Sequence, residues 1–113
     1  MRSLLKFLER KERLINMVYL EKNNLDELIT SGKYLLDFYA EWCMPCKMLS
    51  SVLESIDDKI NIIKINIDEF PDLASSYKVM SVPTLVFTVD GKKVHELIGY
   101  CDEEKLIEVI EEL

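Results

Sequence analysis

The spacing of apolar and polar residues predicts a chain of alternating strands and helices. Two near-continuous apolar runs are typical of strands buried on both faces, and three further apolar or alternating runs indicate additional strands. The predicted strands cover residues 15–20, 34–40, 61–67, 84–89 and 92–98. Apolar residues at helical spacing indicate helices that begin at Asn24, after residue 43, at Pro71 and at Asp102.

The order of these elements favours a mixed sheet between two layers of helices. The early strand-helix-strand units give parallel pairing, whereas Asp90-Gly91 predicts a tight antiparallel hairpin between the last two strands. We therefore expect an α/β fold, a three-layer sandwich with a central mixed sheet of about five strands. The 113 residues are enough for one such domain and too few for two.

Composition and charge narrow the classes of function. With 49% hydrophobic residues the chain is not disordered, and no apolar run reaches the roughly 18 residues of a membrane-spanning helix. A net charge of −7 disfavours nucleic acid as a partner. All three arginines lie in the first 13 residues, which carry a net charge of +3, whereas residues 14–113 carry −10. This break predicts a basic N-terminal extension over residues 1–16, followed by a single domain over residues 17–113.

The extension has the pattern of a short basic amphipathic helix, with Leu4, Leu5 and Leu8 beside its basic residues. It is either dispensable, with Met17 as an alternative start, or it lies on an anionic membrane surface or docks on a partner, on the acidic domain or on a second copy. The last alternative would give weak self-association. Charged residues interrupt its apolar run, so it does not fit a secretory signal, and we expect a cytoplasmic location. In that compartment cysteine pairs are more often catalytic or metal-binding than structural.

The residues at 42–47, Trp-Cys-Met-Pro-Cys-Lys, directly follow a predicted buried strand and begin a predicted helix. At a helix N-terminus, free amide N–H groups and the helix dipole stabilise a thiolate at the first cysteine. Because a thiolate is the species that attacks a disulfide, we expect Cys43 to be an accessible nucleophile and Cys46 to be the buried resolving thiol. The two can form a redox-active disulfide, and Pro45 between them stiffens its ring.

Zinc binding is the main alternative, since Cys43, Cys46, Cys101 and His95 form a Cys₃His set. The chain has no second Cys-x-x-Cys and no His-x₃-His spacing, and so apolar a domain needs no metal core. We therefore expect no bound metal. A merely structural disulfide fits neither the compartment nor so small a ring. Cys101 is either a small buried hydrophobe or a third redox thiol.

The chain resembles the thioredoxin family over roughly residues 17–113. Besides the motif at 42–47, the resemblance rests on Asp-Phe-Tyr-Ala-Glu at 37–41, Asn-Ile-Asp at 66–68, Val-Pro-Thr at 82–84, Asp-Gly at 90–91 and Gly99. It implies a thioredoxin fold and a protein-disulfide reductase that works by dithiol exchange without a bound cofactor. The implied partners are disulfide-bearing proteins and a thioredoxin reductase or equivalent dithiol donor.

The resemblance also implies roles for residues outside the cysteine pair. Asp37, an acid within a run predicted to be buried, is expected to accept the proton of Cys46. Lys64 matches the family's lysine near that carboxylate, the alternative being a lysine whose stem crosses the core and whose head reaches water. Pro83 matches the family's cis-proline, which faces the cysteine pair. The residues expected to contact substrate are Trp42, Met44, Pro45, Val82, Pro83 and Gly99.

Two observations bear on what kind of family member this is. Met44 replaces the usual glycine and places a flexible apolar side chain beside the nucleophile. No histidine lies between the cysteines, which within the family favours a reductant. The alternative class is a binding or assembly module that keeps the fold and uses the same surface. Such a module would have no need of both cysteines, Asp37 and Pro83.

Overall fold

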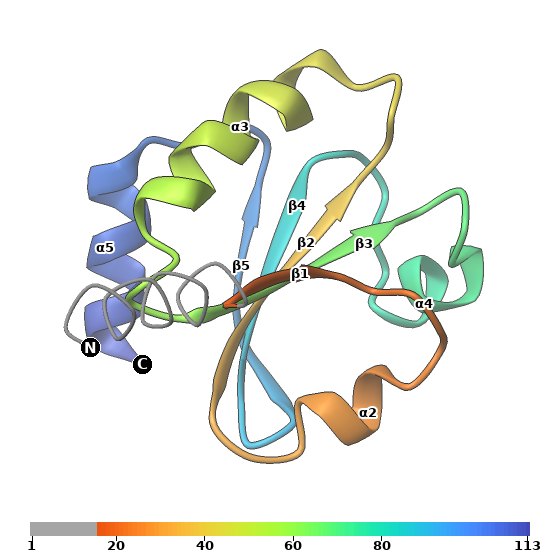
Figure 1. Cartoon of the computed structure of the whole chain (residues 1–113), viewed down its shortest axis with the longest axis horizontal. Coiled ribbons are helices and arrows are strands. Elements are labelled where there is room, and N and C mark those ends of the chain that lie inside the picture. Colours follow the sequence, from red (N-terminus) through yellow and green to blue (C-terminus); the bar gives the residue numbers. More distant parts are fainter. Residues whose placement is uncertain (1–15) are drawn as a thin grey trace, which may run out of the picture.

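A five-stranded mixed sheet organises the computed structural model, which describes residues 16–113 (Figure 1). The strand order is β1-β3-β2-β4-β5, with β1–β3 and β3–β2 parallel and β2–β4 and β4–β5 antiparallel. The strands are β1 (Met17–Tyr19), β2 (Lys33–Tyr39), β3 (Asn61–Asn66), β4 (Thr84–Val89) and β5 (Lys92–Ile98). The helices are α2 (Leu25–Leu28), α3 (Met44–Ser55), α4 (Pro71–Ser76) and α5 (Glu103–Glu112).

The element order and the mixed pairing confirm the fold that the hydrophobic pattern predicts. The first strand is shorter than expected, with three residues in the ladder. The predicted helical extension lies outside the described residues, apart from residue 16. The domain boundary at residue 17 therefore stays a prediction.

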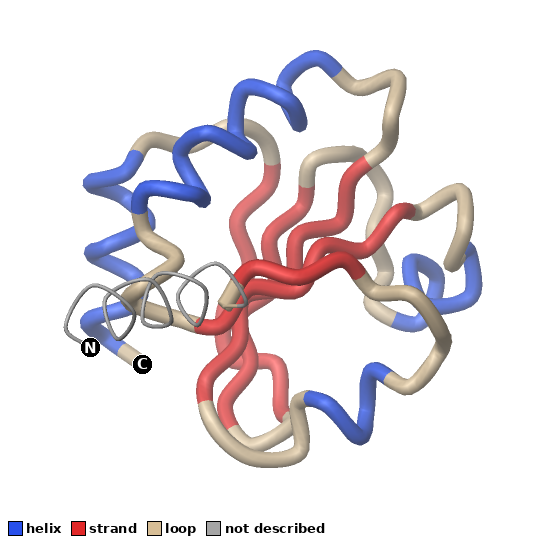
Figure 2. Tube along the Cα trace, in the orientation of Figure 1, coloured by secondary structure: helices blue, strands red, loops and turns tan. Residues whose placement is uncertain are grey.

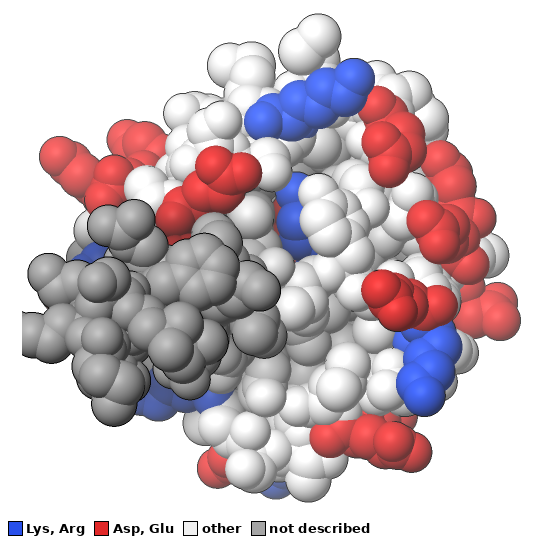
Figure 3. All heavy atoms as spheres, viewed as in Figure 1, with Lys and Arg blue, Asp and Glu red and all other residues white. Residues whose placement is uncertain are grey.

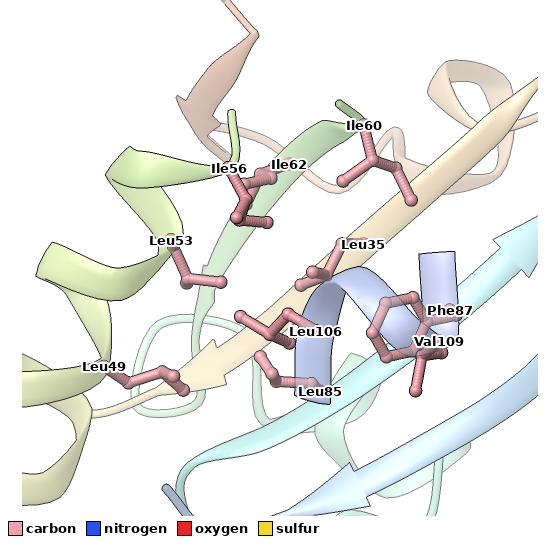
Figure 4. Close-up of a cluster of buried hydrophobic side chains, with 10 residues drawn as sticks. All are labelled: Leu35, Leu49, Leu53, Ile56, Ile60, Ile62, Leu85, Phe87, Leu106 and Val109. Atoms are coloured by element: carbon pink, nitrogen blue, oxygen red, sulfur yellow. The ribbon is translucent and has the colours of Figure 1, made fainter. Parts of the chain in front are cut away.

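Helices cover both faces of the sheet, with α3 and α5 on one side and α2 and α4 on the other (Figures 1 and 2). Each face has its own apolar core. The α3–α5 side buries side chains from both helices, from β2, β3 and β4 and from the connection between α3 and β3; they are Leu35, Leu49, Leu53, Ile56, Ile60, Ile62, Leu85, Phe87, Leu106 and Val109 (Figure 4). The opposite core includes Leu25, Ile29, Leu36 and Phe38.

The alternation of β2 places a carboxylate under α3. Leu35 belongs to the α3–α5 core, whereas Leu36 and Phe38 belong to the α2–α4 core. Because side chains alternate along a strand, Asp37 lies on the same face as Leu35. Its neighbour across the parallel β2–β3 ladder is Lys64. Two ionisable groups therefore lie side by side on the covered face of the sheet.

Turn and cap residues decide where several elements begin. Asp90 and Gly91 have φ values of 50° and 85°, as a tight hairpin between β4 and β5 requires. The Asp102 side chain accepts a hydrogen bond from the Lys105 N–H at 2.9 Å and caps α5 as predicted. Asn24 stands at the start of α2, but its side chain makes no capping hydrogen bond. The short α2 is therefore held by burial of Leu25 rather than by its cap.

Apart from Asp37 and Lys64, the charged side chains of the described residues lie at the surface. On the face drawn in Figure 3, acidic side chains lie around much of the margin, and uncharged residues occupy most of the middle. Each helix within residues 16–113 is too short or too polar to span a bilayer.

A candidate redox-active cysteine site

The cysteine pair occupies the N-terminus of α3, directly after the loop that leaves β2. Cys43 and Cys46 are joined by a disulfide, with their Cα atoms 5.3 Å apart. Cys43 is the N-cap residue, and its Sγ accepts a hydrogen bond from the Cys46 N–H at 3.2 Å. Pro45 lies in the first turn, where its missing N–H costs no helical hydrogen bond. In the reduced protein the same N–H and the helix dipole would stabilise negative charge on this sulfur.

The prediction that Cys43 is accessible and Cys46 is buried is wrong for this disulfide form, in which both are buried. Cys43 is 4% exposed and Cys46 is 3% exposed. Both pack in a small cluster with Tyr39 and Ala40, and Val82 contacts this cluster. The packing explains the error: both cysteines lie in one cluster against which Val82 packs from a distant loop, and a sequence pattern local to α3 does not reveal that contact.

The Val82–Pro83 peptide bond is cis, as the resemblance implies. The Pro83 carbonyl accepts a hydrogen bond from the Gly99 N–H at 2.8 Å, and the Thr84 hydroxyl donates to the Ser81 carbonyl at 2.7 Å. These bonds fix the loop before β4 beside the residue that follows β5. Val82, Pro83 and Gly99, predicted from separate parts of the chain, therefore belong to one region next to the disulfide.

Exposed apolar side chains flank the pair. Trp42 and Met44 are 69% and 64% exposed, and Pro45 between the cysteines is also exposed. The Trp42 indole donates its Nε1–H to Asp68 Oδ2 at 3.1 Å, which fixes the ring relative to the end of β3. Asp68 belongs to the Asn-Ile-Asp motif, but the sequence alone did not assign it as a partner of Trp42. Its polar side chain after a buried strand was the available signal.

Asp37 is fully buried, and Lys64 lies beside it. The Lys64 Nζ is 3.6 Å from Asp37 Oδ2, an ion-pair distance that is too long for a hydrogen bond. Within the described part of the chain, neither carboxylate oxygen of Asp37 has a hydrogen-bond partner. Burial raises the Asp37 pKa to about 6, although the Lys64 charge and its long polar contact with the carboxylate act in the opposite direction. Asp37 can therefore change its protonation state near neutral pH.

Lys64 is almost fully buried, with 4% of its surface exposed. Its ammonium donates to the Ser50 hydroxyl at 2.9 Å. It also lies 5.4 Å and 5.0 Å from the ring centroids of Tyr19 and Tyr39, within cation–π range. An open pocket of about 340 Å³ is lined by these residues and by Cys46.

Sequence reasoning did not single out Ser50, Tyr19 or Tyr39 as neighbours of Lys64. Ser50 follows Cys46 by four residues on the same helix, so the spacing was a signal for their shared face. The tyrosines come from two strands that are not neighbours in the sheet. Only the sheet order brings them together over β3.

The residues of the alternative zinc set are not arranged as ligands. His95 is exposed on β5 and packs edge-on against Phe87, with ring centroids 5.9 Å apart. Cys101 is half-buried against the α3–α5 core, and burial raises the pKa of its thiol to about 11. Among residues 16–113, no three His, Cys, Asp or Glu side chains are gathered as a metal site requires.

Comparisons with known proteins match nearly the whole described chain to one family. The thioredoxin family model matches residues 16–112. A thioredoxin of Staphylococcus saprophyticus is 44% identical over 99 residues, which cover 84% of this chain and 95% of that protein. A thioredoxin of Chlamydia caviae is 44% identical over 90 residues, covering 77% and 88% of the two chains. The structure of a mutant thioredoxin from Halobacterium salinarum superposes with a TM-score of 0.79 at 40% identity, covering 85% and 88%. The chain belongs to the thioredoxin family.

Proposed function

We propose that this chain reduces protein disulfides, with Cys43 as the attacking thiolate and Cys46 as the resolving thiol. One observation carries the assignment of the two roles. The Sγ of Cys43 caps α3 and accepts the Cys46 N–H, so the helix terminus favours negative charge on Cys43. Cys46 lies inside the helix, facing the pocket that also contains Lys64.

The reaction proceeds in two exchanges. The Cys43 thiolate attacks one sulfur of the substrate disulfide, that S–S bond breaks, and the second substrate sulfur leaves as a thiolate that takes a proton from water. A disulfide now joins Cys43 to the substrate. Cys46 then loses its proton and attacks the Cys43 sulfur, which closes the disulfide found in this structure and expels the remaining substrate thiolate. The substrate gains two electrons and the cysteine pair loses two.

Asp37 is the proposed acceptor of the Cys46 proton. Its pKa of about 6 leaves it mostly ionised at pH 7 and yet closer to thiol pKa values than an ordinary carboxyl group. Lys64, 3.6 Å away, offsets part of the cost of this buried negative charge. Asp37 itself is fully buried, whereas Lys64 and Cys46 line the open pocket that connects this site to solvent.

The proposed docking rim consists of the apolar and backbone groups around the pair, namely Trp42, Met44, Pro45, Val82, Pro83 and Gly99. An extended substrate segment would pair with the backbone of Val82 and place its disulfide over Cys43. Oxidised protein then requires a dithiol donor, a thioredoxin reductase or an equivalent, to return two electrons. A cytoplasmic location, where such donors keep thiols reduced, fits this cycle.

An insulin-reduction assay tests the proposal. The wild-type protein, kept reduced by dithiothreitol, is expected to accelerate precipitation of the insulin B chain. Cys46→Ser should stop turnover. When it is reduced first and mixed with insulin after dithiothreitol is removed, it should accumulate a disulfide between Cys43 and insulin, visible on a non-reducing gel and by mass spectrometry. Cys43→Ser is the matched control and should form no such adduct. An adduct through Cys46 in the Cys43→Ser protein, equal in rate to that of Cys46→Ser, would reverse the two roles.

A further inference from the structure

The hydroxyl of Ser50 has a defined partner on the buried charge pair. Ser50 lies on α3, one turn after Cys46, and lines the same pocket. Its Oγ accepts a hydrogen bond from the Lys64 ammonium at 2.9 Å. This is shorter than the 3.6 Å from the ammonium to Asp37 Oδ2. The lysine is therefore bonded to the helix more closely than to the carboxylate on the neighbouring strand.

Two aromatic rings hold the same ammonium. Tyr19 on β1 and Tyr39 on β2 lie edge-to-face, with centroids 5.9 Å apart, and Lys64 lies within 5.4 Å of both centroids. The two ring faces and the Ser50 hydroxyl together compensate the Lys64 ammonium for the hydration that it loses on burial. Asp37, by contrast, receives no hydrogen bond from the described residues.

We propose that Ser50 is a positioning residue: with the rings of Tyr19 and Tyr39, it holds the Lys64 ammonium just beyond hydrogen-bonding reach of Asp37. The carboxylate then experiences the lysine charge but only a long, weak N–H···O contact. This inference rests on the proposed function for its catalytic meaning, since Asp37 is there the base that deprotonates Cys46. A carboxylate with a direct charge-assisted hydrogen bond would be a weaker base.

Removal of the Ser50 hydroxyl should shift the Asp37 pKa in a predictable direction. In Ser50→Ala the buried ammonium loses its side-chain oxygen acceptor on α3. Asp37 Oδ2, 3.6 Å from the ammonium, is an unsatisfied acceptor, and a movement of less than an ångström brings Lys64 into hydrogen-bond range of it. The new bond stabilises ionised Asp37, so the carboxyl pKa should fall below that of the wild-type protein.

Other charged and titratable groups surround this pair and are common to all variants. Lys64 on β3 is the cation that acts on Asp37, and Cys46 lies on α3. Asp37 also acts electrostatically on Tyr39 of β2 and on Cys101, which precedes α5. The remaining groups at or near the pocket are Tyr19, Glu41, Lys47, Glu54 and Glu69.

The test is an NMR titration of the Asp37 carboxyl carbon in the oxidised protein, in which Cys43 and Cys46 do not titrate. Four proteins are compared: wild type, Ser50→Ala, Ser50→Thr and Ser51→Ala. Ser50→Thr keeps the hydroxyl and should restore the wild-type midpoint. Ser51→Ala is the matched control, because Ser51 lines the same pocket from an exposed position on the same helix. Backbone spectra of each protein establish that the fold is kept.

We expect the Asp37 midpoint of Ser50→Ala to fall by about one pH unit, while the other two variants stay at the wild-type value. An unchanged midpoint in Ser50→Ala would overturn the proposal. A raised midpoint would overturn it as well, because it would mean that the lysine leaves the carboxylate when the hydroxyl is removed. The titration does not depend on disulfide reduction, so failure of the insulin assay and failure of this inference are separate results.

Discussion

The buried Asp37 carboxyl should make the stability of the protein fall as the pH rises. Its pKa is about 6 in the folded protein against 3.8 for an ordinary aspartate, so the native state binds more protons between these pH values. Stability therefore decreases as pH rises through this window, because the unfolded state loses its proton first. A difference of about two pKa units corresponds to about 3 kcal/mol.

Asp37→Asn isolates this contribution. Asparagine keeps the shape of the side chain and does not titrate, while the other acidic residues are the same in both proteins. Removal of the negative charge leaves Lys64 without its counter-ion, which shifts the absolute stability of the variant. The slope with pH, rather than the value at a single pH, is therefore the diagnostic quantity.

Urea unfolding of the two oxidised proteins at several pH values from about 3.5 to 7.5 measures it. Relative to Asp37→Asn, the wild-type protein should lose about 3 kcal/mol across this range, with most of the loss between about pH 4 and 6. A flat difference would refute the raised pKa. A difference of opposite sign would mean that attraction to Lys64 exceeds the cost of burial.

Three further predictions concern other elements. Burial raises the Cys101 pKa to about 11, so iodoacetamide at pH 8 should alkylate this thiol roughly a hundredfold more slowly than a free cysteine. Mass spectrometry after mild peroxide treatment should find Cys101 unmodified, whereas ready oxidation would support a redox role. Asp102→Ala removes the α5 cap and should lower the free energy of unfolding, measured in urea, by about 1 kcal/mol. An equal loss in the neighbouring control Glu103→Ala would contradict the capping role of Asp102. Gly99→Ala should lower the free energy of unfolding by about 1 to 2 kcal/mol through backbone conformation alone, because the residue has a φ of +88° and an added Cβ would meet no described atom within 4 Å. Unchanged stability would contradict this argument from backbone strain.

The fold followed from sequence patterns wherever the physical cause was local. Residues 34–40 and 61–67 are apolar on both faces because helices cover both sides of β2 and β3, and their runs predicted this directly. Asp90-Gly91 predicted its hairpin because few other dipeptides tolerate the required positive φ. Asn24 was less informative. A capping residue adds little stability to a four-residue helix when one buried leucine already fixes the segment.

The site was predictable where one motif contained the chemistry, and less so where separate strands had to meet. The cysteine pair and its helix terminus are contiguous in sequence, so their relation is fixed by helix geometry. The packing around the cysteine pair includes Val82, from a distant part of the sequence, and the ring contacts of Lys64 depend on the order of β1, β3 and β2. Such contacts require the register of the sheet, which hydrophobic periodicity does not specify.

One helix connects the sulfur chemistry to the buried charges. Cys43, Cys46 and Ser50 follow one another at intervals of three and four residues, so α3 presents a cap sulfur, a thiol and a hydroxyl along one face. The cap sulfur lies beside the loop of Val82, and the hydroxyl bonds to Lys64 one turn beyond the thiol. A displacement of α3 relative to β3 would therefore change the surroundings of the Cys43 sulfur and the position of the Lys64 ammonium at the same time. Leu49 and Leu53, fully buried against the sheet from the same helix, hold that relation fixed.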